Sequence, residues 1–203
     1  RSPALLAKTA ASLDAISNGR LELGVGLGWQ EEEYEASGIS FDQRAKIFWE
    51  TLDICQSLWR GGPVSHKGEI FEFNDIWCHP IPPQGSDIPL LFGVKMTESN
   101  AQKIAKIGHG WIPIKTSRDF ISEGSEKLNN AFKEAGRDDK PRIRGQLPTC
   151  VDSNGVPSVD LTLKELEKSM EAGLEEIEVF PINFAQSPDH LREVLELIGE
   201  LKK

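Results

Sequence analysis

The sequence predicts an α/β protein built around a parallel sheet. From residue 88 onward, short apolar runs alternate with longer amphipathic segments, and the last three runs begin about 32 residues apart, roughly one strand–helix unit. Residues 88–94 form a nearly continuous apolar run, which is typical of a strand covered on both faces. Parallel neighbours need long right-handed crossovers, and the amphipathic segments supply them as helices.

The first third of the chain begins with a predicted helix over residues 3–17, because Pro3 suits a first turn and the apolar residues share one stripe. Asn18 and Gly19 end that helix. The alternation in residues 21–25 predicts a strand, and a loop rich in glycine and acidic residues is expected over 26–40.

Residues 41–60 form the clearest predicted helix, since apolar side chains recur there at steps of three and four. A Pro-rich excursion over 61–87 is expected to hold a hairpin and an extended return. The regular part follows, with predicted strands at 88–94, 111–114, 142–147 and 176–180, and helices at 98–107, 117–135, 162–172 and 188–202.

Five predicted strands leave two architectures open. An open, doubly wound sheet can use five strands. A (β/α)₈ barrel needs eight, so it would require three further units ahead of these. In either case we expect residues 1–203 to form a single domain.

The composition excludes several classes of function. The 203 residues carry 23 Lys and Arg against 32 Asp and Glu, a net charge of −9, which argues against nucleic-acid and anionic-membrane partners. No apolar run approaches the roughly 20 residues of a membrane span. The three cysteines form no metal-binding or disulfide pattern, so we expect no metal and a cytoplasmic location.

Gly24-Val25-Gly26-Leu27-Gly28-Trp29 resembles a dinucleotide fingerprint only loosely, because its third glycine follows the second by two residues instead of three. The acidic run at residues 31–33 would also repel a pyrophosphate. Two interpretations remain. The glycines either let a flat ring lie against the backbone, or they satisfy a turn that needs positive φ.

Two further segments have both a functional and a plain interpretation. The acidic run at 31–33 holds a general acid/base or simply forms a solvated first helical turn. The segment 93–99 joins a buried strand to a helix. Its Lys95, Thr97 and Ser99 either hold a phosphate with the backbone N–H groups, or Thr97 or Ser99 only caps the helix.

Taken together, these segments resemble the luciferase-like monooxygenase family. The segments that carry the resemblance are Ser17-Asn18-Gly19-Arg20-Leu21, Gly24 to Trp29 with Glu31-Glu32-Glu33-Tyr34, Gly68-Glu69-Ile70-Phe71, and Gly108-His109-Gly110-Trp111. The resemblance implies a TIM (β/α)₈ barrel whose strands four to eight are present and whose first three βα units are missing. It looks most like the branch that depends on the deazaflavin coenzyme F420.

The resemblance also implies a function and a site. The chain would be an oxidoreductase, or a fragment of one, that transfers hydride between coenzyme F420 (alternatively FMN) and a small organic substrate. Many relatives carry a glycine pair where this chain has Val94-Lys95. The implied ring contacts are Gly26, Leu27, Gly28 and Trp29, the implied phosphate or tail contacts are Val94, Lys95, Met96 and Thr97, and Glu32 is the candidate acid/base.

A second hypothesis makes the chain a non-catalytic ligand-binding or assembly protein derived from that family. Its first and last predicted strands, 21–25 and 176–180, would be open sheet edges. Because open edges pair readily with other chains, we expect a homodimer or a swapped oligomer.

Overall fold

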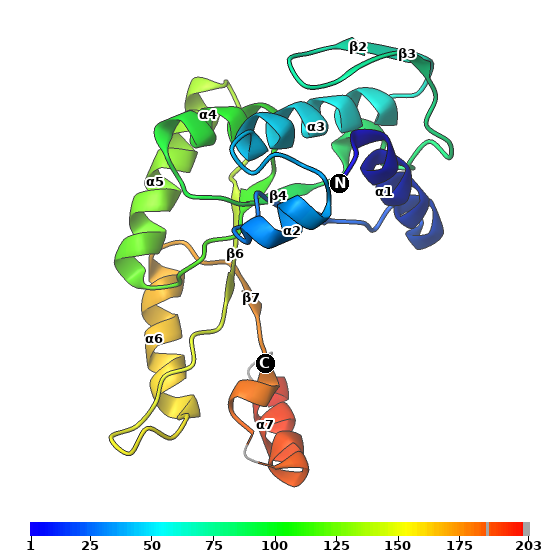
Figure 1. The fold of residues 1–203 in the computed structure, drawn as a ribbon. Helices are drawn as coiled ribbons and strands as arrows, with labels where there is room; N and C mark the ends of the chain where they lie inside the picture. Colours follow the sequence, from blue (N-terminus) through cyan, green and yellow to red (C-terminus); the bar gives the residue numbers. More distant parts are fainter. Residues whose placement is uncertain (186, 201–203) are drawn as a thin grey trace. The chain divides into compact units, whose positions relative to one another are not determined.

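The structure is a computed structural model that describes residues 1–185 and 187–200. It contains two compact units, residues 1–92 and 93–203, whose elements are labelled in Figure 1. The single domain expected over 1–203 stays a prediction. Within the described part of the chain, no helix is long and apolar enough to cross a membrane.

Helix α1 (Pro3–Ser17) matches its predicted bounds because both of its ends are capped. The Ser2 hydroxyl accepts a hydrogen bond from the Leu5 N–H at 3.3 Å, and proline follows in the first turn. At the other end Asn18 takes a left-handed conformation with φ 56°, and the Gly19 N–H donates to the Asp14 carbonyl at 2.9 Å.

Helix α3 (Arg44–Trp59) packs against α1, and the two helices lie side by side in Figure 1. Alanines 7, 10 and 11 of α1 are at most 2% exposed, and their small side chains let the helices approach closely. The buried Trp59 indole donates to the Ala7 carbonyl at 2.9 Å, so this large ring satisfies its polar atom inside the core.

Strands β1 (Leu23–Gly26) and β4 (Leu90–Gly93) are neighbours in the larger sheet. A 2.8 Å hydrogen bond joins the Leu23 N–H to the Pro89 carbonyl. Residues 90–92 are fully buried, as predicted for a strand covered on both faces. Phe92 stacks on Trp49 of α3 with ring centroids 5.4 Å apart. The loop expected over 26–40 instead contains a short helix, α2 (Glu31–Ala36).

The predicted hairpin is present in the Pro-rich excursion. Strands β2 (Val64–Lys67) and β3 (Glu72–Ile76) pair in antiparallel fashion, and the short 3₁₀ helix η1 (Gly85–Asp87) follows on the way to β4. Figure 1 shows the hairpin next to α3. The Glu50 carboxylate of α3 accepts hydrogen bonds from the Phe71 N–H at 2.8 Å and the Ile70 N–H at 3.1 Å, and it contacts His66 Nε2 at 3.0 Å.

Because of these contacts, we expect the packing of the hairpin on α3 to weaken at acid pH. Burial would raise the pKa of Glu50, but hydrogen bonds from the Phe71 N–H, His66 and the Ile70 N–H outweigh it, so this pKa lies below its ordinary 4.5. The carboxylate therefore stabilises the fold above pH 4.5, and its contribution is lost as the pH falls through the lower folded-state pKa.

We expect Glu50→Gln to cost about 1–3 kcal/mol at pH 7 and to remove this part of the acid sensitivity. Urea unfolding at pH 7 and at successively lower pH would measure both effects. The matched control is Glu69→Gln, because Glu69 is 72% exposed and pairs with the exposed Lys46. Equal pH dependence in Glu50→Gln and the native chain would contradict the prediction.

Unit 2 alternates helices and strands as predicted. Strands β5, β6 and β7 are neighbours in that order and run parallel, with Trp111 opposite Ile143 and Gly145 opposite Ile177. The bounds are α4 (Glu98–Ile107), β5 (Gly110–Trp111), α5 (Arg118–Glu134), β6 (Arg142–Gln146), α6 (Val159–Glu171), β7 (Glu176–Glu178), η2 (Pro181–Asn183) and α7 (Pro188–Glu200).

Several predicted elements of unit 2 differ at their ends: α5 and β6 by one residue, β7 by two and the start of α6 by three. The strand expected over 111–114 stops at Trp111, because Pro113 has no N–H to donate to a ladder. The last helix is expected to reach residue 202, and positions 201 and 202 lie outside the described residues.

Candidate functional site

The carboxyl end of β1 borders a cavity of about 520 Å³ in unit 1. Every residue from Leu23 to Gly28 contributes to its wall. Because side chains alternate between the two faces of a strand, a wall of consecutive residues means that the cavity runs along the backbone. Gly24 and Gly26 are exposed and carry no side chain, so a bound group can lie directly against the main chain here.

Helix α2 fixes the loop that follows β1. The Tyr34 hydroxyl donates a hydrogen bond to the Leu27 carbonyl, and the Tyr34 ring meets Phe41 edge to face at 5.3 Å. Gly28 has φ 76°, a left-handed conformation that other residues rarely adopt. Gly28 therefore makes the turn that the second interpretation predicts. Gly24 and Gly26 leave the backbone exposed, and the contact with a flat ring stays a prediction.

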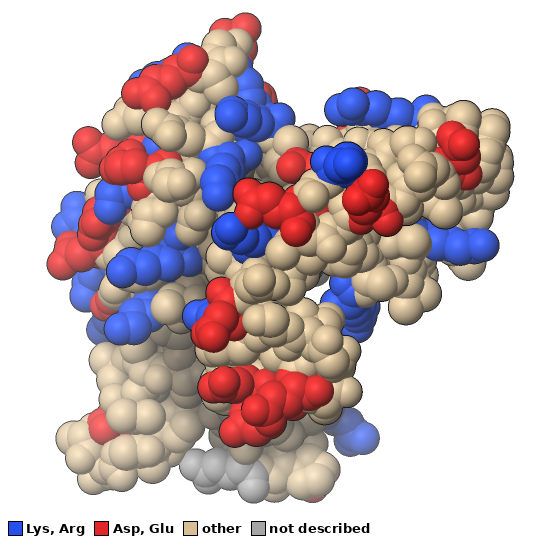
Figure 2. Space-filling view, turned by 45° about the horizontal axis from the view of Figure 1, so that its top comes forward, with Lys and Arg blue, Asp and Glu red and all other residues tan. Residues whose placement is uncertain are grey.

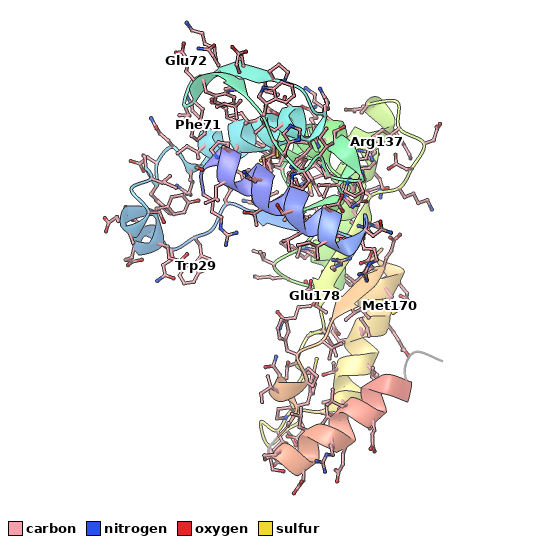
Figure 3. The ribbon with its side chains drawn as sticks, turned by 90° about the vertical axis from the view of Figure 1, so that its right-hand side faces the viewer. Trp29, Phe71, Glu72, Arg137, Met170 and Glu178 are labelled. Atoms are coloured by element: carbon pink, nitrogen blue, oxygen red, sulfur yellow. The ribbon has the colours of Figure 1, made fainter. Side chains whose placement is uncertain are left out.

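Trp29 and Glu32 do not lie on the cavity wall. The turn at Gly28 leaves the Trp29 side chain 84% exposed and pointing away from the body of unit 1 (Figure 3). Glu32 lies on the exposed surface of α2, and its neighbour Glu33 is the carboxylate that borders the cavity. The run 31–33 forms the first turn of α2, where the helix dipole favours negative charge.

The opposite wall comes from one face of α3. Its lining side chains follow a helical spacing and comprise Arg44, Ile47, Phe48, Thr51 and Leu52. The Arg44 guanidinium lies 3.8 Å from the Phe41 ring centroid and donates to the Phe41 carbonyl at 2.8 Å. The Thr51 hydroxyl is buried and has no hydrogen-bond partner among the described residues. Sequence reasoning gave neither Arg44 nor Thr51 a role, because both lie on a helix face that also carries core residues.

The segment Val94 to Thr97 belongs to unit 2 and is described there by itself. Val94 is 4% exposed, and its carbonyl accepts a hydrogen bond from the Trp111 indole at 2.9 Å. Lys95, Met96 and Thr97 border a hollow of about 410 Å³ together with Trp111. The Thr97 hydroxyl accepts from the Asn100 N–H at 3.2 Å, so it caps α4 as the plain interpretation predicts.

Charges around this hollow are largely balanced. Lys127 pairs with Glu123 at 2.5 Å, and this hydrogen bond lowers the pKa of Glu123. Lys95 adds a positive charge and Glu98 a negative one. Figure 2 shows the same pattern on a larger scale, with acidic and basic side chains interspersed over the visible face.

The family model of luciferase-like monooxygenases matches residues 1–156. The chain belongs to this family.

Relatives of this luciferase-like chain agree with the assignment. An uncharacterized protein of Mycobacterium tuberculosis is 37% identical over 142 residues, which are 70% of this chain and 49% of the relative. The chain thus spans about half the length of the Mycobacterium relatives that it matches. The resemblance seen in the glycine-rich and Gly-His-Gly-Trp motifs is confirmed at the level of the family.

Solved structures share the fold of this luciferase-like chain. An F420-dependent secondary alcohol dehydrogenase, in complex with an F420-acetone adduct, has a TM-score of 0.72 at 20% identity and covers 87% of this chain and 68% of its own. The oxygenating constituent of 3,6-diketocamphane monooxygenase from Pseudomonas putida, in complex with FMN, has a TM-score of 0.61 at 21% identity. That match covers 75% of this chain and 46% of the monooxygenase chain. The α/β class with a parallel sheet is confirmed.

Proposed function

We propose that this chain is part of an oxidoreductase of the luciferase-like type, in which hydride passes between a reduced deazaflavin or flavin and a small organic substrate. The observation that carries the proposal is the cavity along β1, where exposed glycine backbone forms a wall in a member of this family. The strands β1, β4, β5, β6 and β7 would correspond to the fourth to eighth strands of a (β/α)₈ barrel.

The residues present fit a flat ring. A volume of about 520 Å³ lies within the roughly 300–1,000 Å³ of ordinary ligand pockets. Gly24 and Gly26 leave the backbone accessible on one side, and Ile47 and Phe48 supply an apolar wall on the other.

Each part of this wall has a defined task in the proposal. The cofactor supplies the hydride chemistry when bound. Gly26 and Gly28 bring the main chain close to the ring, and Tyr34 holds their loop through the Leu27 carbonyl. Phe48 excludes water from the ring face. Glu33 replaces Glu32 as the candidate acid/base, because it is the carboxylate on the cavity wall.

Coenzyme F420 is our first choice of cofactor and FMN the alternative. Solved neighbours include enzymes of both kinds, so their folds alone do not separate the two. Titration of the purified chain with each cofactor, followed by cofactor fluorescence, would test the proposal. Saturable binding at micromolar concentration would support it, and binding of neither would overturn it for this chain.

A single substitution tests where the ring binds. Gly26 has no left-handed φ, so Gly26→Val is compatible with a β-strand and adds a branched side chain at the cavity wall. We expect at least about a tenfold loss of cofactor affinity without loss of folding. Lys67→Val is the control, since Lys67 is an exposed residue of β2 outside the cavity. Native affinity in Gly26→Val would show that the ring binds elsewhere.

A further inference from the structure

A short segment that contains α2 forms one wall of the cavity along β1. This segment, residues 29–37 with Trp29 at its start, projects from the rest of unit 1 (Figure 3). None of the six residues of α2 is buried. The segment and its flanks nevertheless contribute six residues to the cavity wall, namely Leu27, Gly28, Glu33, Tyr34, Ser37 and Ile39. Displacement of the segment would therefore widen the entrance to the cavity.

A glycine with a left-handed conformation stands at each end of the segment. Gly28 has φ 76° and Gly38 has φ 65°. A Cβ on Gly38 would meet no described atom within 4 Å, so the need for glycine there is conformational and not steric. Because glycine also adopts other backbone conformations at little cost, these two positions can act as hinges.

The helix between the hinges is weak by itself. A helix of six residues is too short to be stable alone. Four of its residues are glutamates, whose like charges repel one another. In the part of the chain that the structure describes, none of these glutamate side chains makes a hydrogen bond or an ion pair. The position of α2 therefore depends on its remaining large side chain, Tyr34.

The Tyr34 side chain makes contacts beyond both hinges. Its hydroxyl donates a hydrogen bond to the Leu27 carbonyl, which precedes the first hinge. Its ring meets Phe41, which follows the second hinge, edge to face at 5.3 Å. Phe41 is held in turn by Arg44 of α3, whose guanidinium lies 3.8 Å from the ring centroid and donates to the Phe41 carbonyl at 2.8 Å. One side chain thus fastens the segment to the rest of unit 1.

We propose that residues 29–37 form a lid over the cavity along β1. Gly28 and Gly38 are its hinges, and Tyr34 is its latch. The structure shows the latched position. Release of the latch moves the lid away, so a ligand can enter and leave, and a ligand that contacts the lid favours the latched position. This inference rests on the proposed function for the identity of the ligand, whereas the lid itself can be tested in the free chain.

A glutamate-specific protease measures how often the lid opens, because the cleavage rate follows the population of the open form. Tyr34→Phe keeps the ring and removes the latching hydrogen bond, so we expect cleavage at residues 31–35 to be about fivefold faster than in the native chain. Gly38→Ala should accelerate it at least about fivefold, since alanine disfavours the left-handed conformation of the latched lid. Cleavage after the exposed Glu69, between β2 and β3, is the internal reference and should not change.

Ser37→Ala is the matched control. Ser37 also borders the cavity, but its hydroxyl donates to the Glu33 carbonyl inside the lid at 2.7 Å. Cleavage of the lid in this variant should stay within about twofold of the native rate. Native cleavage of the lid in either Tyr34→Phe or Gly38→Ala would overturn the proposal, and so would an equal acceleration at the reference site, because that would indicate global unfolding.

Coenzyme F420 and FMN, each added to the native chain, connect the lid to ligand binding. The cofactor that binds should slow cleavage of the lid at least about fivefold at saturation and leave the reference site unchanged. Binding without this protection would overturn the lid and leave the proposed function intact. If neither cofactor binds, the proposed function fails, and the comparison of Tyr34→Phe with the native chain still decides whether the lid exists.

Discussion

Asp14→Ala is expected to cost at least about 3 kcal/mol of unfolding free energy, one of the two largest losses that we predict for a single substitution in this chain. Asp14 is fully buried in α1. Its carboxylate accepts hydrogen bonds from the Gln84 N–H at 3.0 Å, the Gln84 amide at 2.8 Å and the Leu21 N–H at 3.3 Å. One side chain thereby joins a helix, the loop into β1 and the end of the Pro-rich excursion.

Alanine would leave the part-buried N–H groups of Leu21 and Gln84 without this acceptor, while the Gln84 amide keeps its 2.9 Å bond to the Leu21 carbonyl. Asp14→Asn keeps one acceptor oxygen, so its unfolding free energy should lie between those of the native chain and Asp14→Ala. Asp42→Ala is the control, because Asp42 is exposed and should change stability by no more than about 0.5 kcal/mol. Urea unfolding followed by tryptophan fluorescence would measure the series. Asp14→Ala and Asp42→Ala with the same midpoint would contradict the assigned hydrogen bonds.

Helices with strong local signals could be predicted from the sequence almost to the residue. Helix α4 (Glu98–Ile107) has the predicted bounds, because the Thr97 cap and Gly108 define its ends locally. Helix α2 was predicted only in part: the plain interpretation of residues 31–33 as a first helical turn is confirmed, but the rest of the helix was expected to be loop. Its six residues are mostly acidic and exposed, so they have no apolar periodicity. It is held by the Tyr34 hydroxyl on the Leu27 carbonyl, a contact that no local pattern records.

The candidate site also combines features that a sequence shows with features that only the packing shows. Glycines at the end of a strand are visible in a sequence, and Gly26, Leu27 and Gly28 do border the cavity. The orientation of Trp29 depends on the left-handed turn at Gly28, which a sequence pattern does not determine. Thr51 lies among the core residues of an amphipathic helix, and no sequence pattern singles it out. Only the three-dimensional packing shows that its hydroxyl is buried beside a cavity without a described partner.

Gly124→Ala is expected to destabilise unit 2 by about 2–3 kcal/mol, although alanine favours helices over glycine by about 1 kcal/mol. A Cβ on Gly124 of α5 would lie 2.2 Å from Trp111 Cη2 and 2.3 Å from Cζ3. The indole has little freedom to move away, since it is 1% exposed and its Nε1–H donates to the Val94 carbonyl at 2.9 Å. Overpacking against a fixed ring therefore outweighs the gain in helix propensity.

Gly199→Ala is the matched control, because Gly199 is also helical and a Cβ there would meet no described atom within 4 Å. That substitution should stabilise the chain by up to about 1 kcal/mol, so the two alanine substitutions are predicted to act with opposite sign. Thermal unfolding of both variants would measure the difference. A smaller ring in Trp111→Phe should reduce the cost of Gly124→Ala in a double-mutant cycle. Stabilisation by Gly124→Ala equal to that by Gly199→Ala would contradict the close packing of α5 on Trp111.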